Sequence, residues 1–331
     1  MSDLQHTAPD AISDALTHEA DAAIETAMHI KAEIARHIFG QDRVIEETLT
    51  TLLSGGHALI VGVPGLAKTL LVETLGTVLG LSEKRVQFTP DLLPADILGS
   101  EVLEEDAQGK RAFRFLPGPI FSQLFMADEI NRASPRTQSA LLQSMQERQV
   151  SIAGERHNLP EPFHVLATQN PIEQEGTYPL PEAQLDRFLM QIDVDYPDRL
   201  SERQILLHTT GITATSIAKV IDANQLLMLQ KLVRKLPVGE AVVDAVLDLV
   251  RGARPGNDHP EIVWGPGPRA AQSLMLGCRA RALLDGRLVP SVDDVKALAM
   301  PVLRHRMALS FSARADGLTN DQVITDLAGR L

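Results

Sequence analysis

Hydrophobic residues in the first eighty positions change from a helical spacing to a continuous apolar run. Before Gly40 the apolar side chains recur about one helical turn apart, and this glycine is placed to end the helix. Residues 58–61 are uniformly apolar, which is typical of a strand buried on both faces. The expected elements are a poorly ordered segment over 1–16, helices over 17–39 and 42–53, a strand over 58–61 and a helix over 70–79.

The middle of the chain alternates short apolar runs with turns and helices. Ser134 and Pro135 supply an N-cap and a first-turn proline for one helix. Two pairs of short strands joined by turns predict hairpins, and a polar turn over 106–110 belongs to the first. The expected strands cover 85–89, 124–127, 163–168 and 189–194, the hairpins cover 101–115 and 149–157, and a short helix covers 181–188.

The sequence changes character after residue 198, where the strand patterns stop. Apolar residues then recur three and four positions apart, as at Val242, Val246 and Leu249, which is the pattern of amphipathic helices. The pattern predicts an α/β domain over 17–198 and an all-helical domain over 199–331.

Composition and charge narrow the class of protein. The 331 residues include 31 basic and 43 acidic side chains, a net charge of −12, and 44% are hydrophobic. This length suffices for two ordinary domains, and the negative charge opposes binding to nucleic acid or anionic membranes. Cys278 is the single cysteine, which excludes an internal disulfide. Without a secretion signal or an apolar run near twenty residues, we expect a soluble cytoplasmic protein that does not insert into membranes.

A glycine-rich turn joins the strand at 58–61 to the following helix. Gly62 and Gly65 allow backbone N–H groups to turn inward around a polyphosphate, at a helix N-terminus that favours negative charge. Lys68 can then reach the β- and γ-phosphates of ATP, and Thr69 can bind Mg²⁺. The expected nucleotide-binding residues of this loop are Gly62, Val63, Pro64, Gly65, Leu66, Ala67, Lys68, Thr69 and Leu70.

Ala67 stands where the pattern G-x-x-x-x-G-K-[ST] has its second glycine. If its φ is negative, alanine can donate the same N–H group, and the loop is intact with a slightly altered geometry. The alternative is an ordinary strand-to-helix turn without a ligand. Gly40 and Gln41 precede the helix at 42–53, a position that lies over the adenine ring in many P-loop ATPases, and they are the candidate adenine contacts.

Two adjacent carboxylates follow the strand at 124–127. Asp128 would hold Mg²⁺ beside Thr69, and Glu129 would orient and deprotonate the attacking water. A solvated acidic pair at a strand end is the alternative. The lysine and threonine of the glycine-rich turn favour the catalytic interpretation.

Three polar residues farther along the chain are candidates for the same site. Asn170 follows the strand at 163–168 and can hydrogen-bond the γ-phosphate or the attacking water, or it can simply form an Asn-Pro turn. Arg187 ends a short helix, and a function for it depends on a partner. Arg269 follows Pro268 in a first helical turn, where a cation is disfavoured. A bound phosphate would compensate; otherwise it is an exposed surface arginine.

These motifs, in this order, resemble those of AAA+ ATPases and, more narrowly, of the MoxR family, in which an alanine before the lysine is usual. The resemblance is carried by Gly62 to Thr69, Asp128 to Arg132, Ala167 to Pro171 and Leu180 to Phe188. It implies Lys68 and Thr69 as Walker A, Asp128 and Glu129 as Walker B, Asn170 as sensor 1, Arg187 as arginine finger and Arg269 as sensor 2. The sequence at 265–269 departs from the expected Gly-x-Ser-Pro-Arg form, and whether Arg269 acts in cis or in trans stays open.

The resemblance also implies a fold, cofactors and partners. The fold would be a parallel five-stranded sheet in the order 5-1-4-3-2, flanked by helices, with a C-terminal all-helical lid. ATP and Mg²⁺ would be the cofactors, and the chains would form a ring, usually a hexamer. Such rings remodel, assemble or activate protein clients, often metalloenzyme complexes, and often act with a protein that has a von Willebrand factor A domain.

Two other classes of function are alternatives for the same site. A nucleic-acid-translocating AAA+ ATPase is opposed by the net charge of −12 and by the lack of a stripe of aromatic and basic residues. A nucleotide-dependent scaffold without significant hydrolysis would need neither Glu129 nor Arg187. The two hairpins are either contacts for a client or surface decoration.

Overall fold

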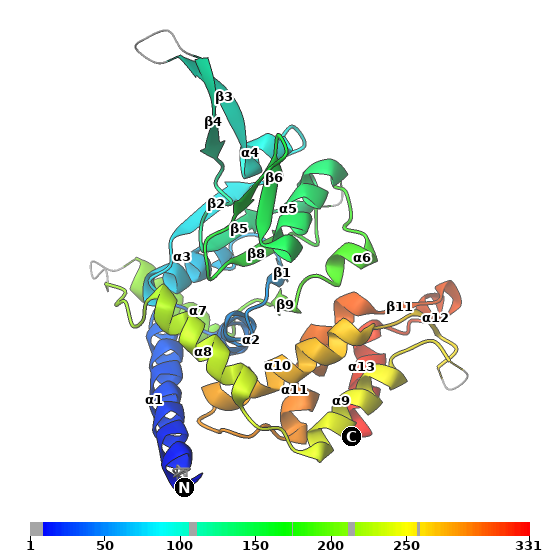
Figure 1. Ribbon diagram of the computed structural model, residues 1–331. Coiled ribbons are helices and arrows are strands. Elements are labelled where there is room, and N and C mark those ends of the chain that lie inside the picture. Colours follow the sequence, from blue (N-terminus) through cyan, green and yellow to red (C-terminus); the bar gives the residue numbers. More distant parts are fainter. Residues whose placement is uncertain (1–8, 106–110, 174, 211–215, 257–258) are drawn as a thin grey trace, which may run out of the picture.

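A computed structural model describes residues 9–105, 111–173, 175–210, 216–256 and 259–331, with the backbone alone described at 9–19 and at 209. Figure 1 shows a sheet with its flanking helices above a second group of helices. The hairpin turn expected at 106–110 lies outside the described residues.

A parallel sheet of five strands forms the centre of the upper part. Its strands lie in the order β2 (Glu83–Gln87), β5 (Leu124–Asp128), β8 (His164–Gln169), β1 (Ala58–Gly62) and β9 (Met190–Val194). When these five strands are numbered along the chain, the order is the expected 5-1-4-3-2, so the predicted fold is confirmed. The inner strand β5 is buried throughout, whereas its neighbour at the edge of the sheet, β2, is mostly exposed.

Strand β5 shows how the two faces of the sheet are covered. Leu124 joins a core with α2 (Asp42–Leu53) and α3 (Lys68–Val78), whereas Phe125 joins a second core with α5 (Pro135–Glu147). Successive side chains of a strand point to opposite faces, so an apolar run such as β5 can supply both cores. Because the strands are parallel, the loops after β1, β5 and β8 leave the sheet at one edge.

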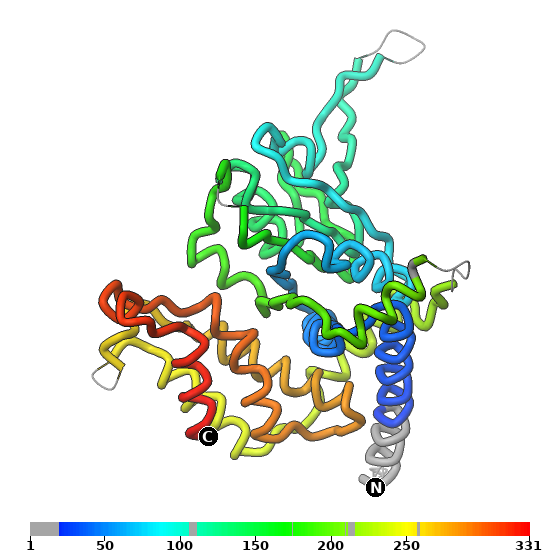
Figure 2. The backbone as a smooth tube through the Cα atoms, turned by 180° about the vertical axis from the view of Figure 1, so that it is seen from behind, coloured from blue at the N-terminus to red at the C-terminus, as the bar shows by residue number. Residues whose placement is uncertain are grey.

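Two antiparallel hairpins extend this α/β part. α4 (Pro94–Leu98) leads into β3 (Gly99–Glu105) and β4 (Arg111–Pro117), and β6 (Gln149–Ile152) pairs with β7 (Glu155–Asn158). Figure 1 and Figure 2 both show the β3–β4 hairpin projecting at the end of the molecule opposite the C-terminal helices. The rings of Phe115 and His157 stack with their centroids 4.0 Å apart, so the two hairpins are in contact.

The lower part of the molecule is mainly helical and packs against the N-terminal helix α1 (Pro9–Ala35) and against α2. Its elements are α7 (Arg199–Thr209), α8 (Ala223–Lys235), α9 (Glu240–Gly252), β10 (Ile262–Trp264), α10 (Pro268–Leu284), α11 (Val292–Leu303), η2 (Arg304–Arg306), β11 (Ala308–Leu309), α12 (Phe311–Ala315) and α13 (Asn320–Gly329). The short helices η1 (Ile130–Arg132) and α6 (Glu182–Leu185) lie in connections of the α/β part. None of the helices in the described ranges is long and apolar enough to cross a membrane.

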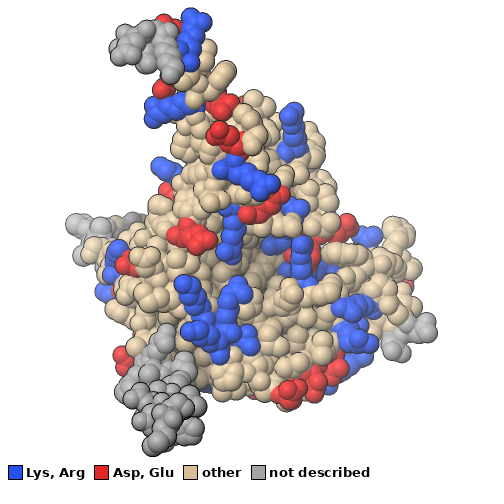
Figure 3. All heavy atoms as spheres, in the orientation of Figure 1, with Lys and Arg blue, Asp and Glu red and all other residues tan. Residues whose placement is uncertain are grey.

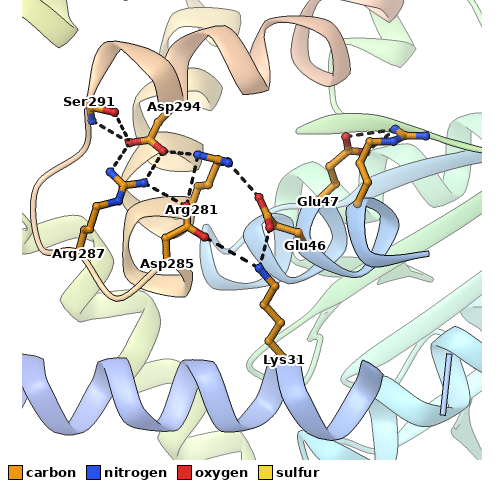
Figure 4. A network of polar contacts seen from close by, with 9 residues as sticks. Lys31, Glu46, Glu47, Arg281, Asp285, Arg287, Ser291 and Asp294 are labelled. Carbon is orange, nitrogen blue, oxygen red and sulfur yellow. Dashed lines mark hydrogen bonds and ion pairs between the residues drawn. The ribbon is translucent and has the colours of Figure 1, made fainter. Parts of the chain in front are cut away.

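A chain of charged side chains joins α1 and α2 to the helical part (Figure 4). Lys31 Nζ lies 2.7 Å from Glu46 Oε2, and Arg281 Nε lies 3.0 Å from Glu46 Oε1. Arg281 and Arg287 both donate to the fully buried carboxylate of Asp294. Burial raises the pKa of Asp294, but hydrogen bonds from Arg287, a backbone N–H group and Arg281 outweigh it and lower the pKa to about 2. The carboxylate therefore stays ionised at neutral pH and holds both arginines.

Several elements differ from the predicted ones. The strands β10 and β11 pair within the region expected to be all helical. α3 and α6 are offset by one to three residues from the predicted helices at 70–79 and 181–188. α1 begins at Pro9 rather than Thr17 and ends at Ala35 rather than Phe39, so residues 9–16, expected to be unordered, are helical. α7 lies in the region expected to be helical but was not predicted as a separate helix, because its apolar residues cluster near its C-terminal end instead of recurring at each turn. Its start is set by Asp198, whose side chain accepts a hydrogen bond from the backbone N–H of Ser201 at 2.8 Å. The domain division at residue 198 stays a prediction.

Candidate functional site

The glycine-rich turn connects β1 to α3, which begins at Lys68. Gly65 has a φ of 85°, and no atom lies within 4 Å of where its Cβ would be, so the turn is open at its tip. Ala67 has a φ of 56°, and its carbonyl oxygen accepts the Leu71 N–H at 2.9 Å. The negative φ expected at Ala67 is therefore wrong. The tight entry into α3 imposes a left-handed conformation, which costs an L-residue about 1–2 kcal/mol more than glycine.

The side chain of Lys68 folds back over the turn. Its Nζ donates to the carbonyl oxygen of Gly62, and to that of Val63 at 3.3 Å. Burial lowers the pKa of Lys68, and the carboxylates of Asp128 and Glu129 oppose this shift. The ammonium group thus lies within the field of both acidic candidates.

One cavity brings most of the predicted nucleotide-binding residues together, and we call it the phosphate-loop cavity. Its volume is about 550 Å³, within the usual range for small-molecule sites. It is lined by Pro64, Gly65, Ala67, Lys68, Thr69, Leu70, Glu73, Arg85, Gln87, Asp128 and Glu129. Gly62 and Val63 contribute through the carbonyl groups that hold the lysine, and Leu66 is buried behind the turn.

The candidate adenine contacts, Gly40 and Gln41, lie beside this cavity and outside its lining. The buried Gln41 donates from Nε2 to the carbonyl oxygen of Leu66 at 3.1 Å, which ties it to the back of the turn. Gly40 has a φ of 72° and packs against Ser201, where a Cβ would lie 2.4 Å from the serine side chain. In this structure Gln41 supports the turn and Gly40 packs against α7, and an adenine contact remains a prediction.

Asp128 lies at the end of β5 and is held by two neighbouring strands. Its Oδ1 accepts the hydroxyl of Thr168 at 2.6 Å, and its Oδ2 accepts Arg85 Nη2 at 2.5 Å and Nε at 3.1 Å. The same threonine oxygen accepts the Glu129 N–H at 2.9 Å. Thr168 and Arg85 were not predicted as site residues because both occur in ordinary strand patterns. Their contacts with Asp128 follow only from the strand order.

Glu129 follows Asp128 in a left-handed conformation, with a φ of 55°. Its Oε2 accepts Gln87 Nε2 at 2.7 Å and Arg132 Nη1 at 2.9 Å. Among the described residues, none donates to its other oxygen, Oε1. The side chain is therefore fixed through one oxygen while the other is available to accept a proton. Gln87 was also missed, although it alternates with Arg85 on the strand that pairs with β5.

Asn170 immediately follows β8 and is 5% exposed. Its Oδ1 accepts the Ile172 N–H at 3.1 Å, which is the contact of the expected Asn-Pro turn. Only the amide oxygen can accept that hydrogen bond, so the amide nitrogen is the end that can donate to a ligand. The turn and the sensor interpretations are therefore compatible.

Arg187 and Arg269 line a different cavity, of about 260 Å³, which we call the arginine cavity. Arg187 Nε is buried and has no hydrogen-bond partner among the described residues. Burial, then the charge of Arg269, lower the pKa of Arg187. Arg269 is half exposed in the first turn of α10, with Nη1 at 3.4 Å from Asp186 Oδ2. Figure 3 shows basic side chains around a hollow between the sheet and the lower helices. Among the described residues, none lines both cavities.

The phosphate-loop cavity fits Mg²⁺ and ATP. The hydroxyl of Thr69 and the carboxylate of Asp128 line it together, and oxygen ligands are those that Mg²⁺ prefers. The backbone N–H groups at the start of α3 and the ammonium of Lys68 would bind an anion such as a polyphosphate.

Comparison with known proteins identifies the family. The profile of the ATPase family associated with various cellular activities (AAA) matches residues 57–190, and that of the AAA lid domain matches residues 256–327. Chaperone MoxR1 of Mycobacterium tuberculosis is 42% identical over 325 residues, which cover 96% of this chain and 84% of that protein. The chain belongs to the MoxR family of AAA+ ATPases.

Other relatives agree with this assignment. Protein MoxR of Methylorubrum extorquens is 31% identical over 309 residues, covering 86% of this MoxR-family chain and 88% of that protein. The crystal structure of an ATPase candidate from Cytophaga hutchinsonii has a TM-score of 0.87 at 36% identity, covering 95% of this chain and 97% of that one. Membership in this family supports nucleotide binding and ATPase activity in general.

Proposed function

We propose that this MoxR-family chain hydrolyses Mg²⁺-bound ATP in a cytoplasmic ring of identical subunits, most simply a hexamer. Arg187 and Arg269 of one subunit would complete the phosphate-loop cavity of the next. The observation that carries the proposal is that Arg187 and Arg269 line a different cavity from the phosphate-loop residues. Among the described residues, none lines both cavities. An arginine stabilises phosphoryl transfer only when it touches the transferred group, so a single chain would lack this contribution.

ATP would bind with its β- and γ-phosphates at the N-terminus of α3. Lys68 would exchange the carbonyl oxygens of Gly62 and Val63 for phosphate oxygens, which carry more negative charge. Thr69 and Asp128 would hold Mg²⁺, which when bound neutralises charge on the β- and γ-phosphates. Thr168 and Arg85 keep the Asp128 carboxylate in place for this role.

Glu129 would act as the general base through Oε1. As it takes a proton from water, the water oxygen bonds to the γ-phosphorus, and the bond from that phosphorus to the β–γ bridging oxygen breaks. ADP leaves with the electron pair of the broken bond. Gln87 and Arg132 hold the base through Oε2, and the amide nitrogen of Asn170 would donate to the γ-phosphate or the water.

The client-directed activity would be remodelling of protein complexes. One relative is named Chaperone MoxR1, which supports an activity on other proteins, and the projecting β3–β4 hairpin supplies a surface far from the lower helices. The resemblance described above suggests metalloenzyme complexes as clients and a von Willebrand factor A protein as partner. Purified candidate complexes that fail to change activity or assembly state with ATP would contradict this part of the proposal.

The test is ATP turnover per subunit against protein concentration for wild type, Arg187→Ala, Glu129→Gln and a mixture of the two variants. We expect specific activity to rise with concentration, and each variant alone to bind ATP without hydrolysing it. The mixture should recover activity, because intact arginines of one variant meet an intact Glu129 of the other. Activity that is independent of concentration down to a demonstrated monomer, and that survives Arg187→Ala, would overturn the shared site.

A further inference from the structure

Arg306 is an arginine at the end of η2 with only 1% of its surface exposed. Its Nε donates to Asp186 Oδ1 at 2.8 Å, and its two terminal nitrogens donate to the carbonyl oxygens of Phe188 at 2.6 Å and Leu189 at 3.1 Å. Nη2 also lies 3.3 Å from Ser273 Oγ in α10. A buried charge must be paired and hydrogen-bonded, and here most of its partners belong to one short segment.

That segment flanks the predicted arginine finger. The acceptors at Asp186, Phe188 and Leu189 lie on both sides of Arg187, so the backbone that carries it is held to the helical part before and after it. Arg187 itself lines the arginine cavity, and within the described part of the chain its buried Nε has no hydrogen-bond partner. The backbone of this residue is thus fixed while its donors are left for a ligand.

Asp186 extends the same arrangement to the second arginine. One of its carboxylate oxygens accepts Arg306, and the other lies 3.4 Å from Arg269 Nη1. Ser273, one helical turn after Arg269 in α10, also contacts Arg306. The buried guanidinium group of Arg306 therefore contacts residues that adjoin both Arg187 and Arg269.

Stability alone is a weak explanation for this contact. Replacing a buried ion pair by apolar side chains of similar volume is often neutral or stabilising, so such pairs are better explained by the geometry they impose. The geometry here is specific, because the planar guanidinium group of Arg306 donates in several fixed directions. The hydrogen bonds of Arg306 therefore join η2 and α10 of the lower part to the segment that precedes β9 of the sheet.

We propose that Asp186 and Arg306 are positioning residues that hold Arg187 and Arg269 as one rigid pair, directed at the phosphate groups of a nucleotide bound by the adjoining subunit. The inference rests on the proposed function. It adds that the helical part fixes the position of Arg187. A shift of the helical part would therefore change the rate of ATP hydrolysis in the adjoining subunit.

The variants that test this are Asp186→Asn and Arg306→Lys, with Arg304→Lys as the matched control. Arg304 lies in the same short helix and likewise joins the helical part to the sheet, but it pairs with Asp193 and Asp321, away from the finger segment. We expect kcat to fall about 10- to 100-fold in both test variants, since a displacement near 1 Å costs that much. ATP affinity should stay within about twofold, as should both parameters in Arg304→Lys.

Mixing separates this inference from the proposed function. Asp186→Asn mixed with Glu129→Gln should recover turnover, as Arg187→Ala mixed with Glu129→Gln does. If the Arg187→Ala mixture recovers activity and the Asp186→Asn mixture does not, the positioning role is wrong and the shared site stands. If neither recovers, the shared site itself fails.

A triple variant distinguishes positioning from general damage. Asp186→Asn added to Arg187→Ala and Arg269→Ala should turn over ATP no more slowly than the variant with the two arginine changes alone, because the carboxylate acts through both arginines. A further loss of tenfold or more in the triple variant, or wild-type turnover in folded Asp186→Asn, would overturn the proposal. Thermal unfolding and oligomer size are measured for each variant, and if Arg306→Lys does not fold, the less buried Asp186→Asn decides.

Discussion

The phosphate-loop cavity and the arginine cavity differ in how their residues are assembled. The first is lined by one turn, the start of α3 and the ends of adjacent parallel strands. The second takes residues from 55–57, from 186–189, from α10 and from η2, which only the packing of the helical part against the sheet brings together. One is a property of the α/β part, and the other belongs to the junction between the two parts.

The two cavities also differ in how far their polar groups are satisfied within the chain. Both oxygens of Asp128 accept hydrogen bonds, whereas the buried Nε of Arg187 has no partner among the described residues. Buried donors without partners are costly, although Arg187 shares this state with the Nε atoms of Arg279 and Arg304. Under the proposed function, the first cavity binds the nucleotide of its own subunit, and the second acts on the nucleotide of the adjoining subunit.

The largest expected effect separates catalysis from binding. Arg187→Ala should lower ATP turnover by about 10³-fold or more, as for arginine fingers supplied in trans, while ATP affinity is kept. Steady-state turnover and equilibrium binding of a fluorescent ATP analogue measure the two quantities. Arg314→Ala, an exposed arginine outside both cavities, is the control and should change neither. Loss of ATP affinity in Arg187→Ala would place this arginine in the binding site and end the distinction between the cavities.

The complementary change is Lys68→Ala in the phosphate-loop cavity. Loss of a charged hydrogen-bond donor of about 1.5–3 kcal/mol should raise the ATP dissociation constant about 10- to 150-fold. Arg269→Ala should leave that constant unchanged, since Arg269 lines only the other cavity. Equal losses of affinity in the two variants would contradict the separation. Isothermal titration with ATP and Mg²⁺ provides the measurement.

Acid should weaken the arginine cavity first, because His57 lines it as a buried neutral histidine. Burial, with the neighbouring His164, lowers the pKa of His57 to about 3. A folded pKa below the unfolded value of about 6.5 means that this stability is present above pH 6.5 and is lost as pH falls toward 3. Between pH 6.5 and 5 the expected loss in the free energy of unfolding is about 2 kcal/mol.

Urea unfolding at pH 7 and pH 5 checks this expectation. His57→Asn should lose about 2 kcal/mol less than wild type over that interval, because its side chain does not titrate. The exposed His29→Asn is the control and should follow wild type. The same pH dependence in His57→Asn and in wild type would show that His57 is not the source.

The smallest expected effect concerns the left-handed residue of the turn. Ala67→Gly should stabilise the fold by about 0.5–1 kcal/mol, because relief of strain exceeds the added entropy of the unfolded chain. The exposed helical Ala297→Gly should instead destabilise it by about 1 kcal/mol. Changes of opposite sign in the free energy of unfolding, measured with urea, would support strain at Ala67. Destabilisation by both substitutions would refute it.

Local sequence patterns were sufficient to predict much of the fold and the main residues of the phosphate-loop cavity. The helix expected over 42–53 has the observed bounds of α2, because its apolar spacing and flanking glycines are local signals. The turn from Gly62 to Thr69 and the pair Asp128 and Glu129 were found because their chemistry depends on residue types at fixed spacing. The φ of Ala67 was not predictable in this way, since the entry angle into α3 is set by packing.

The sequence by itself determined the five strands of the sheet to within two residues, the phosphate-loop residues and the two acidic candidates, since each depends on neighbours within a few positions. It did not predict β10 and β11. Only the tertiary structure decided that Arg85, Gln87 and Thr168 hold those carboxylates, because strand order is not written in any one strand. It also decided that Arg306 meets Asp186 across 120 residues of chain. A buried guanidinium group takes whichever acceptors the packing brings to it, and no local pattern in the chain specifies them.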